Sequence, residues 1–154
     1  MNSMNKKLTH IDEHGRARMV DVGSKPPVRR TAVAEGFFCA ASGTLDRLEA
    51  GDLPKGEGLA VARVAAIQAA KKCDELIPLC HTLPLDVVQV DFDRTGSDRL
   101  RIEATVSTNA RTGVEMEALI AVSIAALTLW DMTKAVDKDL RVDGIRLVSK
   151  KKGT

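Results

Sequence analysis

Two oppositely charged side chains near the end of a long apolar segment are the first candidates for chemistry. Asp131 and Lys134 lie three residues apart, so a helix would place them on one face. The apolar residues before Asp131 predict a partly desolvated carboxylate, and burial raises the pKa of an acid while pairing with a lysine lowers it. Such a pair can exchange protons with a substrate. It can equally be an ordinary ion pair at a helix end, and the spacing alone leaves both interpretations open.

Two carboxylates begin the same apolar segment. Glu115 follows Thr112 by three residues, and this T-x-x-E pattern predicts a capping box that gives Glu115 a structural role. Glu117 has no such role, and positions two apart on a helix diverge by about 200°, so we do not expect the two carboxylates to share one function. Glu117 would lie about 20 Å from Asp131 along one helix. A small substrate could therefore contact both only if a neighbouring subunit supplied one of them.

A short loop between Pro78 and Pro84 carries Cys80 and His81. The two prolines stiffen the loop, which suits holding a side chain in place. No CxxC or HxxxH partner accompanies this pair, so we do not expect structural zinc or another metal. A loop histidine that is only exposed or hydrogen-bonded is the alternative. The three cysteines have no framework spacing, which favours reduced thiols in the cytoplasm.

Positive charge must act locally, because the formal net charge is only +2. Lys55 lies on a glycine-rich stretch, KGEG, before a predicted helix whose N-terminal amides can bind anions. The pattern is not a Walker A loop. Arginine binds phosphate as a fork and lysine as a point charge, although each basic residue taken singly could be a solvated surface residue. The remaining cations come from distant segments: Arg18, Lys25, Arg29, Arg30, Lys71, Lys72 and Lys150 to Lys152.

Hydrophobic periodicity predicts the elements that must position these residues. Alternation predicts strands over 31–39, 88–92, 100–106 and 140–148, with a polar turn at 94–98. Helices are expected over 42–51, 59–76 and 112–136, the first capped by Ser42. The order strand, helices, strand, strand, helix, strand predicts an α+β ferredoxin-like sandwich, an antiparallel sheet with helices packed on one face.

The domain organisation follows from this order. We expect an N-terminal arm over residues 1–27 that contributes to the site, a single ferredoxin-like catalytic domain over 28–150 and a flexible tail over 151–154. Residues 1–8 are polar with no apolar run behind them, so we expect neither a signal peptide nor a membrane span. The helix over 112–136 is apolar nearly all round, and one small sheet cannot cover it. A second subunit is its expected cover.

Five sequence blocks together resemble a known family. They are LTHI at 8–11, MVDV at 19–22, IPLCH at 77–81, TGVEMEAL at 112–119 and DMxKAVDK at 131–138. Over about residues 8–150 the chain resembles the cyclic pyranopterin monophosphate synthase family of molybdenum-cofactor biosynthesis. Two departures stand out: the family's KGDV-type loop is KGEG here, and its glycine-rich tail, usually containing GGKSG, is KKKGT. Phosphate contacts from the tail are therefore left open.

The resemblance implies an activity and an assembly. The implied enzyme is a lyase of the phosphorus–oxygen type that converts (8S)-3′,8-cyclo-7,8-dihydroguanosine 5′-triphosphate to cyclic pyranopterin monophosphate and diphosphate. The implied assembly is a cytoplasmic homohexamer, a trimer of dimers with active sites at subunit contacts. It implies no cofactor and no nucleic-acid or membrane partner, and it leaves open whether Mg²⁺ accompanies the triphosphate.

The resemblance also implies roles for individual residues. Asp131 corresponds to the family's catalytic acid or base, Lys134 to its partner and Lys55 to the lysine of the KGDV-type loop. The substrate-binding segments correspond to Leu79, Cys80, His81, Met116 and Glu117, and the phosphate-side positions to Asp21, Arg18, Lys25, Arg30 and Lys150.

Two other classes of protein share the predicted fold. An RNA-recognition module stacks bases on sheet aromatics, and the middle strands here offer only Phe92, so this class is disfavoured. A non-catalytic oligomeric nucleotide-binding regulatory domain is the stronger alternative. The Asp131–Lys134 pair, together with phosphate-binding cations, favours the enzyme.

Overall fold

The computed structural model describes residues 9–154. The first eight residues of the expected arm, together with the expectation that they hold no targeting segment, lie outside the described part. Along the chain come β1 (Val28–Cys39), α1 (Ser42–Ala50), α2 (Gly58–Lys71), α3 (Cys73–Leu76), β2 (Val87–Gly96), β3 (Arg99–Ala110), α4 (Glu115–Thr133) and β4 (Arg141–Lys152).

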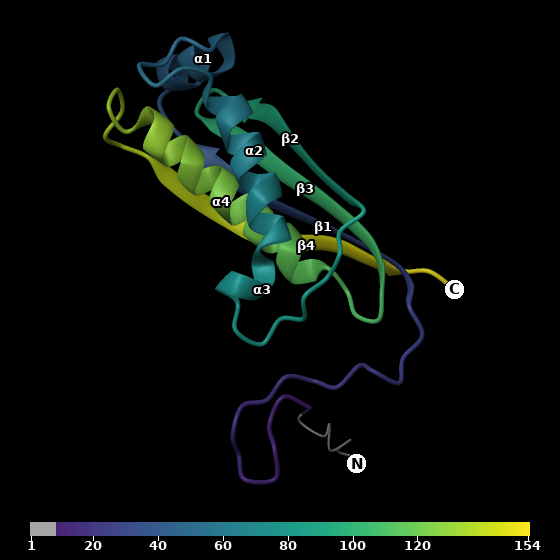
Figure 1. Cartoon of the computed structure of the whole chain (residues 1–154). Coiled ribbons are helices and arrows are strands. Elements are labelled where there is room, and N and C mark those ends of the chain that lie inside the picture. Colours follow the sequence, from purple (N-terminus) through teal and green to yellow (C-terminus); the bar gives the residue numbers. More distant parts are fainter. Residues whose placement is uncertain (1–8) are drawn as a thin grey trace, which may run out of the picture.

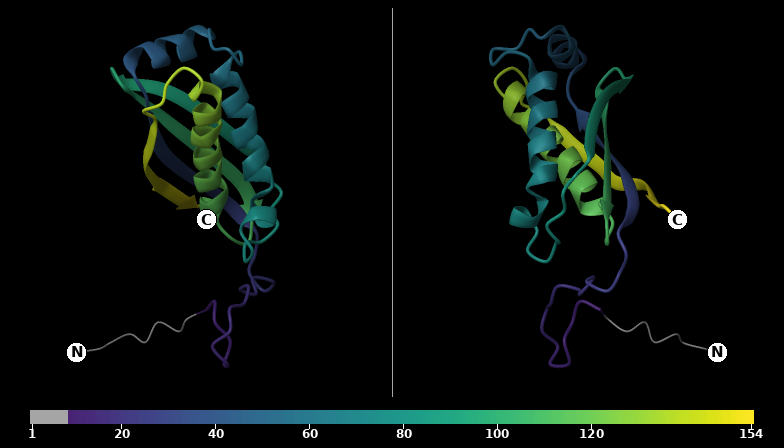
Figure 2. Two further views of the ribbon diagram at one scale, coloured as in Figure 1. Left: turned by 90° about the vertical axis from the view of Figure 1, so that its left-hand side faces the viewer. Right: turned by 45° about the vertical axis from the view of Figure 1, so that its right-hand side comes forward.

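The four strands form one antiparallel sheet in the order β2-β3-β1-β4. Helices α2 and α4 lie side by side across one face of this sheet, and α1 sits at one end of the layer (Figures 1 and 2). Within residues 9–154, no helix covers the opposite face of the sheet (Figure 2). This arrangement confirms the predicted ferredoxin-like α+β sandwich.

Small side chains on the helix-facing side of β1 explain how closely α4 approaches the sheet. Ala32 and Ala34 are buried there, while Glu35 on the other face pairs with Arg101 of β3 at 2.7 Å. A Cβ placed on Gly36 would lie 2.8 Å from Val122 Cγ1 of α4. The alternation in the sequence therefore translates directly into a packed face and a charged face.

Two helix boundaries differ from the sequence predictions. The helix expected over 59–76 is two helices, because the backbone leaves helical geometry at Lys72, with φ −113° and ψ 19°. The predicted capping box at Thr112 and Glu115 was wrong, because α4 begins at Glu115 with no side-chain cap. The Glu115 carboxylate instead pairs with Lys150 of β4 at 3.2 Å. Lys150 lies far along the chain from Glu115, so a local sequence pattern cannot reveal this pairing.

The N-terminal cap of α1 and the C-terminal tail also depart from expectation. Ser42 is the first residue of α1 rather than its cap, and the capping position, Ala41, has no side chain that can serve. Strand β4 continues past the expected end at 148, so that Lys151 and Lys152 pair with Thr31 and Arg30 of β1. These two lysines were expected in a flexible tail; pairing with β1 holds them in the sheet instead.

The described part of the arm, residues 9–27, runs away from the sandwich (Figure 1). It contains one isolated bridge, between Ile11 and Ala17. Helix α4 is long and apolar enough to span a membrane by length and composition, but half of that stretch is buried inside the fold. Its packing on the sheet and on α2 explains the apolar composition without a membrane.

Candidate active site

Three charged residues meet at the C-terminal end of α4. The two carboxylate oxygens of Asp131 each accept a lysine at 2.7 Å, Lys55 on one and Lys134 on the other. Lys55 Nζ also donates to the main-chain oxygen of Asp131 at 3.0 Å. Lys55 comes from the loop between α1 and α2, so the pair predicted from helix spacing is in fact a triad that includes the glycine-loop lysine.

The Asp131 carboxylate is more open than its sequence context suggested. Its side chain is 54% exposed, so the expected desolvation is absent in the isolated chain. The two lysines, Lys134 first and Lys55 next, lower the pKa of Asp131 from 3.8 to about 2. Asp131 is consequently an anion that holds two ammonium groups together, and it stores no proton near neutral pH.

A cavity of about 420 Å³ lies at the other end of α4. Six of the residues assigned to substrate binding line it: Lys25, Leu79, Cys80, His81, Met116 and Glu117. Several other lining residues, among them Val20 and Val22 of the arm and Leu83, had not been assigned to substrate binding. The cavity therefore brings the arm, the IPLCH loop and the start of α4 together.

Glu117 is a buried carboxyl group of this cavity, and its pKa is raised. It is only 3% exposed, and burial is the main cause that raises its pKa, with Glu115 and Asp74 adding repulsion. Glu115 lines the same cavity but is neutralised by Lys150. Both carboxylates face one cavity in different surroundings, and a division of roles between them stays a prediction.

The IPLCH loop presents a histidine and a thiol to the cavity. His81 Nε2 lies 2.7 Å from the main-chain oxygen of Val20, and since a carbonyl oxygen only accepts, this nitrogen carries the proton. The bond attaches the arm to the loop. Burial raises the pKa of the Cys80 thiol and, with Glu117 nearby, raises that of Cys73 to about 12. Neither thiol is poised as a nucleophile.

A second pocket, of about 280 Å³, adjoins the first and shares Gly113 and Glu115 with it. Arg30 and Lys150 line it, as do Lys151 and Lys152, which sequence reasoning had assigned to a solvated tail. The Nε of Arg30 is buried without a hydrogen-bond partner in the described structure. The pocket thus concentrates positive charge beside the main cavity.

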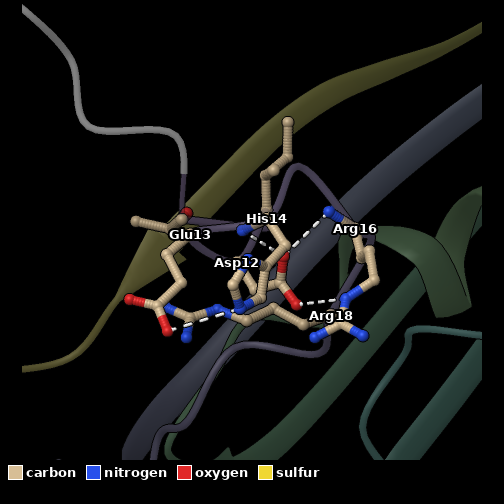
Figure 3. A pocket seen from close by; sticks show the side chains of 7 residues that line it. Asp12, Glu13, His14, Arg16 and Arg18 are labelled. Carbon is tan, nitrogen blue, oxygen red and sulfur yellow. Dashed lines mark hydrogen bonds and ion pairs between the residues drawn. The ribbon is translucent and has the colours of Figure 1, made fainter.

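Arg18 and Asp21 lie outside both pockets. Arg18 lines a hollow of about 790 Å³ that is formed entirely by the arm (Figure 3). There Asp12 accepts Arg16 Nε at 2.9 Å and so stabilises the turn of the arm. The Asp21 carboxylate accepts the main-chain N–H of Gly23 at 2.8 Å. Substrate binding by these two residues stays a prediction. Residues 9–154 contain no group of three or more His, Cys, Asp or Glu side chains arranged to hold a metal.

Residues 19–153 match the MoaC family. The chain belongs to the MoaC family. The cyclic pyranopterin monophosphate synthase of Corynebacterium efficiens is 55% identical over 147 residues, which cover 96% of this chain and 94% of the relative. The synthase of a Roseiflexus species is 56% identical over 147 residues, which cover 95% of this chain and 93% of the relative. That of Chloroflexus aggregans is 56% identical over 149 residues, which cover 96% of this chain and 90% of the relative.

The stretch shared with the MoaC family contains the triad, the second pocket, the arm from Met19 onward and all of the main cavity's lining except Thr9 and His10. It excludes the turn of the arm around Asp12 and, by one residue, Arg18. The relatives are all named as synthases, so the chain is a member of an enzyme family. Glu117 and Asp131 lie fourteen positions apart on α4, about 20 Å along the helix axis. One chain therefore holds two separate groups of candidate residues.

Proposed function

We propose that the protein is a cyclic pyranopterin monophosphate synthase. The substrate would be (8S)-3′,8-cyclo-7,8-dihydroguanosine 5′-triphosphate, and the products cyclic pyranopterin monophosphate and diphosphate, in molybdenum-cofactor biosynthesis. The relatives at 55–56% identity carry this name. The observation that carries the proposal is the Lys55–Asp131–Lys134 triad, because a regulatory domain that only binds a nucleotide has no need of it.

The proposed chemistry needs groups that move protons and groups that bind phosphate. Opening the purine ring and closing the pyranopterin require proton transfers. Burial raises the pKa of Glu117, which favours its protonated form and suits it to such a transfer. Asp131 instead orients Lys55 and Lys134 toward the substrate. As a lyase of the phosphorus–oxygen type, the enzyme would let a ribose-derived hydroxyl attack the α-phosphorus and expel diphosphate.

Protein cations can stabilise the charge of that leaving group. Arg30 and Lys150 lie in the second pocket, and Lys25 lines the main cavity. We assign the polyphosphate to these side chains and propose no resident cofactor.

The separation of the two groups on α4 supports an active site shared between subunits. Met116, Leu127 and Trp130 are exposed on α4, and with Ile120 and Ser123 they follow a spacing of four and three residues, which forms one stripe along the helix. Two copies of α4 packed antiparallel through this stripe would bring the triad of one subunit to the cavity of the other. We propose such a dimer as the unit of a cytoplasmic homohexamer, a trimer of dimers.

The direct test measures diphosphate released from the cyclised nucleotide. We expect Lys55→Ala and Asp131→Asn to abolish turnover, because either change dismantles the triad, while the mass of the assembly in solution is unchanged. Full activity in either variant would contradict the roles assigned to Lys55 and Asp131. A wild-type protein that binds the nucleotide and releases no diphosphate would establish the regulatory alternative.

Mixed assemblies test whether the site is shared. Inactive Asp131→Asn and inactive Glu117→Gln subunits, unfolded together and reassembled, should regain part of the activity, because some contacts then combine an intact triad with an intact cavity. Asp131→Asn mixed with Lys55→Ala is the matched control and should stay inactive, since both changes damage the triad. No recovery in the first mixture would contradict a shared site.

A further inference from the structure

A carboxylate from another part of the chain, that of Asp137, binds the start of helix α1. Asp137 follows α4, and its Oδ2 accepts the main-chain N–H of Ala41 at 2.9 Å and the Thr44 hydroxyl at 2.9 Å. Its Oδ1 accepts the N–H of Asp139 at 2.9 Å. Asp137 and Thr44 are both buried. The main-chain N–H groups of Ala41 and Asp139 keep the pKa of Asp137 below its usual value, so the buried group is ionised and fully partnered.

No residue of α1 can replace this carboxylate. The capping position of α1 is Ala41, with no side-chain hydrogen bond of its own. The N-terminal end of a helix attracts a negative charge, and an oxygen that satisfies its free donors stabilises it. Asp137 supplies the negative charge, and its carboxylate accepts the N–H of the capping residue Ala41 and the hydroxyl of Thr44, 93 residues back along the chain.

The same segment leads directly to the catalytic lysine. Helix α1 ends at Gly51, which has a φ of 70°, and the following loop carries Lys55 back to Asp131 at 2.7 Å. The segment from Ala41 to Lys55 is therefore fixed to the C-terminal region of α4 at both ends, by Asp137 at its start and by Asp131 at its finish. Asp131 and Asp137 are only six residues apart, so one short stretch of chain sets the position of Lys55.

We propose that Asp137 is a positioning residue for the triad: by holding the start of α1, it places Lys55 against Asp131. Asp137 does not itself contact the triad; it acts through α1. The inference rests on the proposed function for its effect on turnover, but its effect on the Lys55–Asp131 contact stands independently. A catalytic group displaced by about 1 Å can lose on the order of a hundredfold in rate, so this anchor has a measurable consequence.

The experiment replaces Asp137 with Asn in the full-length protein and follows two quantities. The carbon-13 signal of the Asp131 carboxyl group, titrated with acid, reports whether Lys55 still pairs with it. In wild type its pKa is about 2. In Asp137→Asn we expect the pKa to rise toward the usual 3.8 but to stop short of it, because Lys134 remains. The kcat should fall by about tenfold to a hundredfold, with a much smaller change in KM.

A second variant and a matched control keep the test decisive. Thr44→Val removes one of the three hydrogen bonds at similar volume, so it should fold and shift both quantities in the same direction by less. Asp139→Asn makes the same change of charge two residues away, on an exposed side chain that makes no recorded hydrogen bond to α1, and should leave the Asp131 titration unchanged.

The outcomes separate a positioning role from a purely structural one. If Asp137→Asn and Thr44→Val lower the melting temperature while the pKa of Asp131 stays near 2 and kcat is unchanged, Asp137 is only a structural cap and the proposal is wrong. If wild type releases no diphosphate, the proposed function fails, yet the titration of Asp131 still decides whether Asp137 positions Lys55.

Discussion

The surroundings of Asp131 and Glu117 shift the pKa values of these two carboxyl groups in opposite directions. Two lysines lower the pKa of Asp131, whereas burial raises that of Glu117. Pairs of titratable groups whose pKa values are pushed apart commonly divide acid and base roles between them. Here the division follows from location, since one group lies at the open end of α4 and the other beneath the arm.

The raised pKa of Glu117 predicts a pH dependence of stability. A carboxyl that prefers its neutral form when folded contributes stability below its unfolded pKa, and this contribution is lost as the pH rises through the higher folded value. The free energy of unfolding of wild type, measured by urea at one fixed protein concentration, should therefore fall relative to that of Glu117→Gln as the pH rises above about 4.5. Glu75→Gln, on an exposed side chain outside the cavity, is the control. Parallel curves for wild type and Glu117→Gln would contradict the assignment.

Local spacing predicted only part of the site. The Asp131–Lys134 pair follows from helical geometry, but its third member, Lys55, was assigned from family resemblance and joins it across 76 residues. Glu115 was misassigned to a capping box because its partner, Lys150, lies on another strand. The exposure of Asp131 could not be read from its apolar neighbours, because only Leu129 among them is buried, while Leu127 and Trp130 are exposed beside it.

At the scale of elements, the small-residue face of β1 determines how α4 packs. Gly36→Ala would place a methyl group 2.8 Å from Val122 Cγ1 and 3.0 Å from Ile145 Cγ1. Such overpacking typically costs about 1–3 kcal/mol, so urea unfolding should show a loss of that size. Gly43→Ala is the matched control, because nothing lies within 4 Å of its added methyl group and alanine favours helix. Equal stability of the two variants would refute the packing argument.

The sequence predicted the order and type of most elements because their periodicity is strong. All four strands and α4 follow from alternation or from a long apolar run. The break between α2 and α3 could not be predicted, since no proline or glycine marks Lys72. The extension of β4 to Lys152 was missed because three consecutive lysines have no strand pattern, and pairing with β1 overrides that local preference.

For the molecule as a whole, the exposed stripe on α4 predicts how copies associate. Leu127 is 57% exposed and lies on the stripe, so Leu127→Glu should place a charge in the proposed subunit contact and dissociate the assembly. Light scattering after size-exclusion chromatography would measure the change in mass. Val87→Glu, a similar change on an exposed residue of β2, should leave the mass unchanged. An unaltered mass for Leu127→Glu would exclude this helix as the contact.

The lysines at the end of edge strand β4 oppose aggregation of this molecule through its sheet. Strand β4 forms one edge of the sheet, and its last residues are Lys150, Lys151 and Lys152. Lysine side chains along an unpaired border repel a second, identical border and discourage the edge-to-edge strand addition that produces open-ended fibres. Growth by hydrogen bonding between sheets is thereby suppressed, which leaves closed, symmetric association through the helical layer as the route for building larger particles.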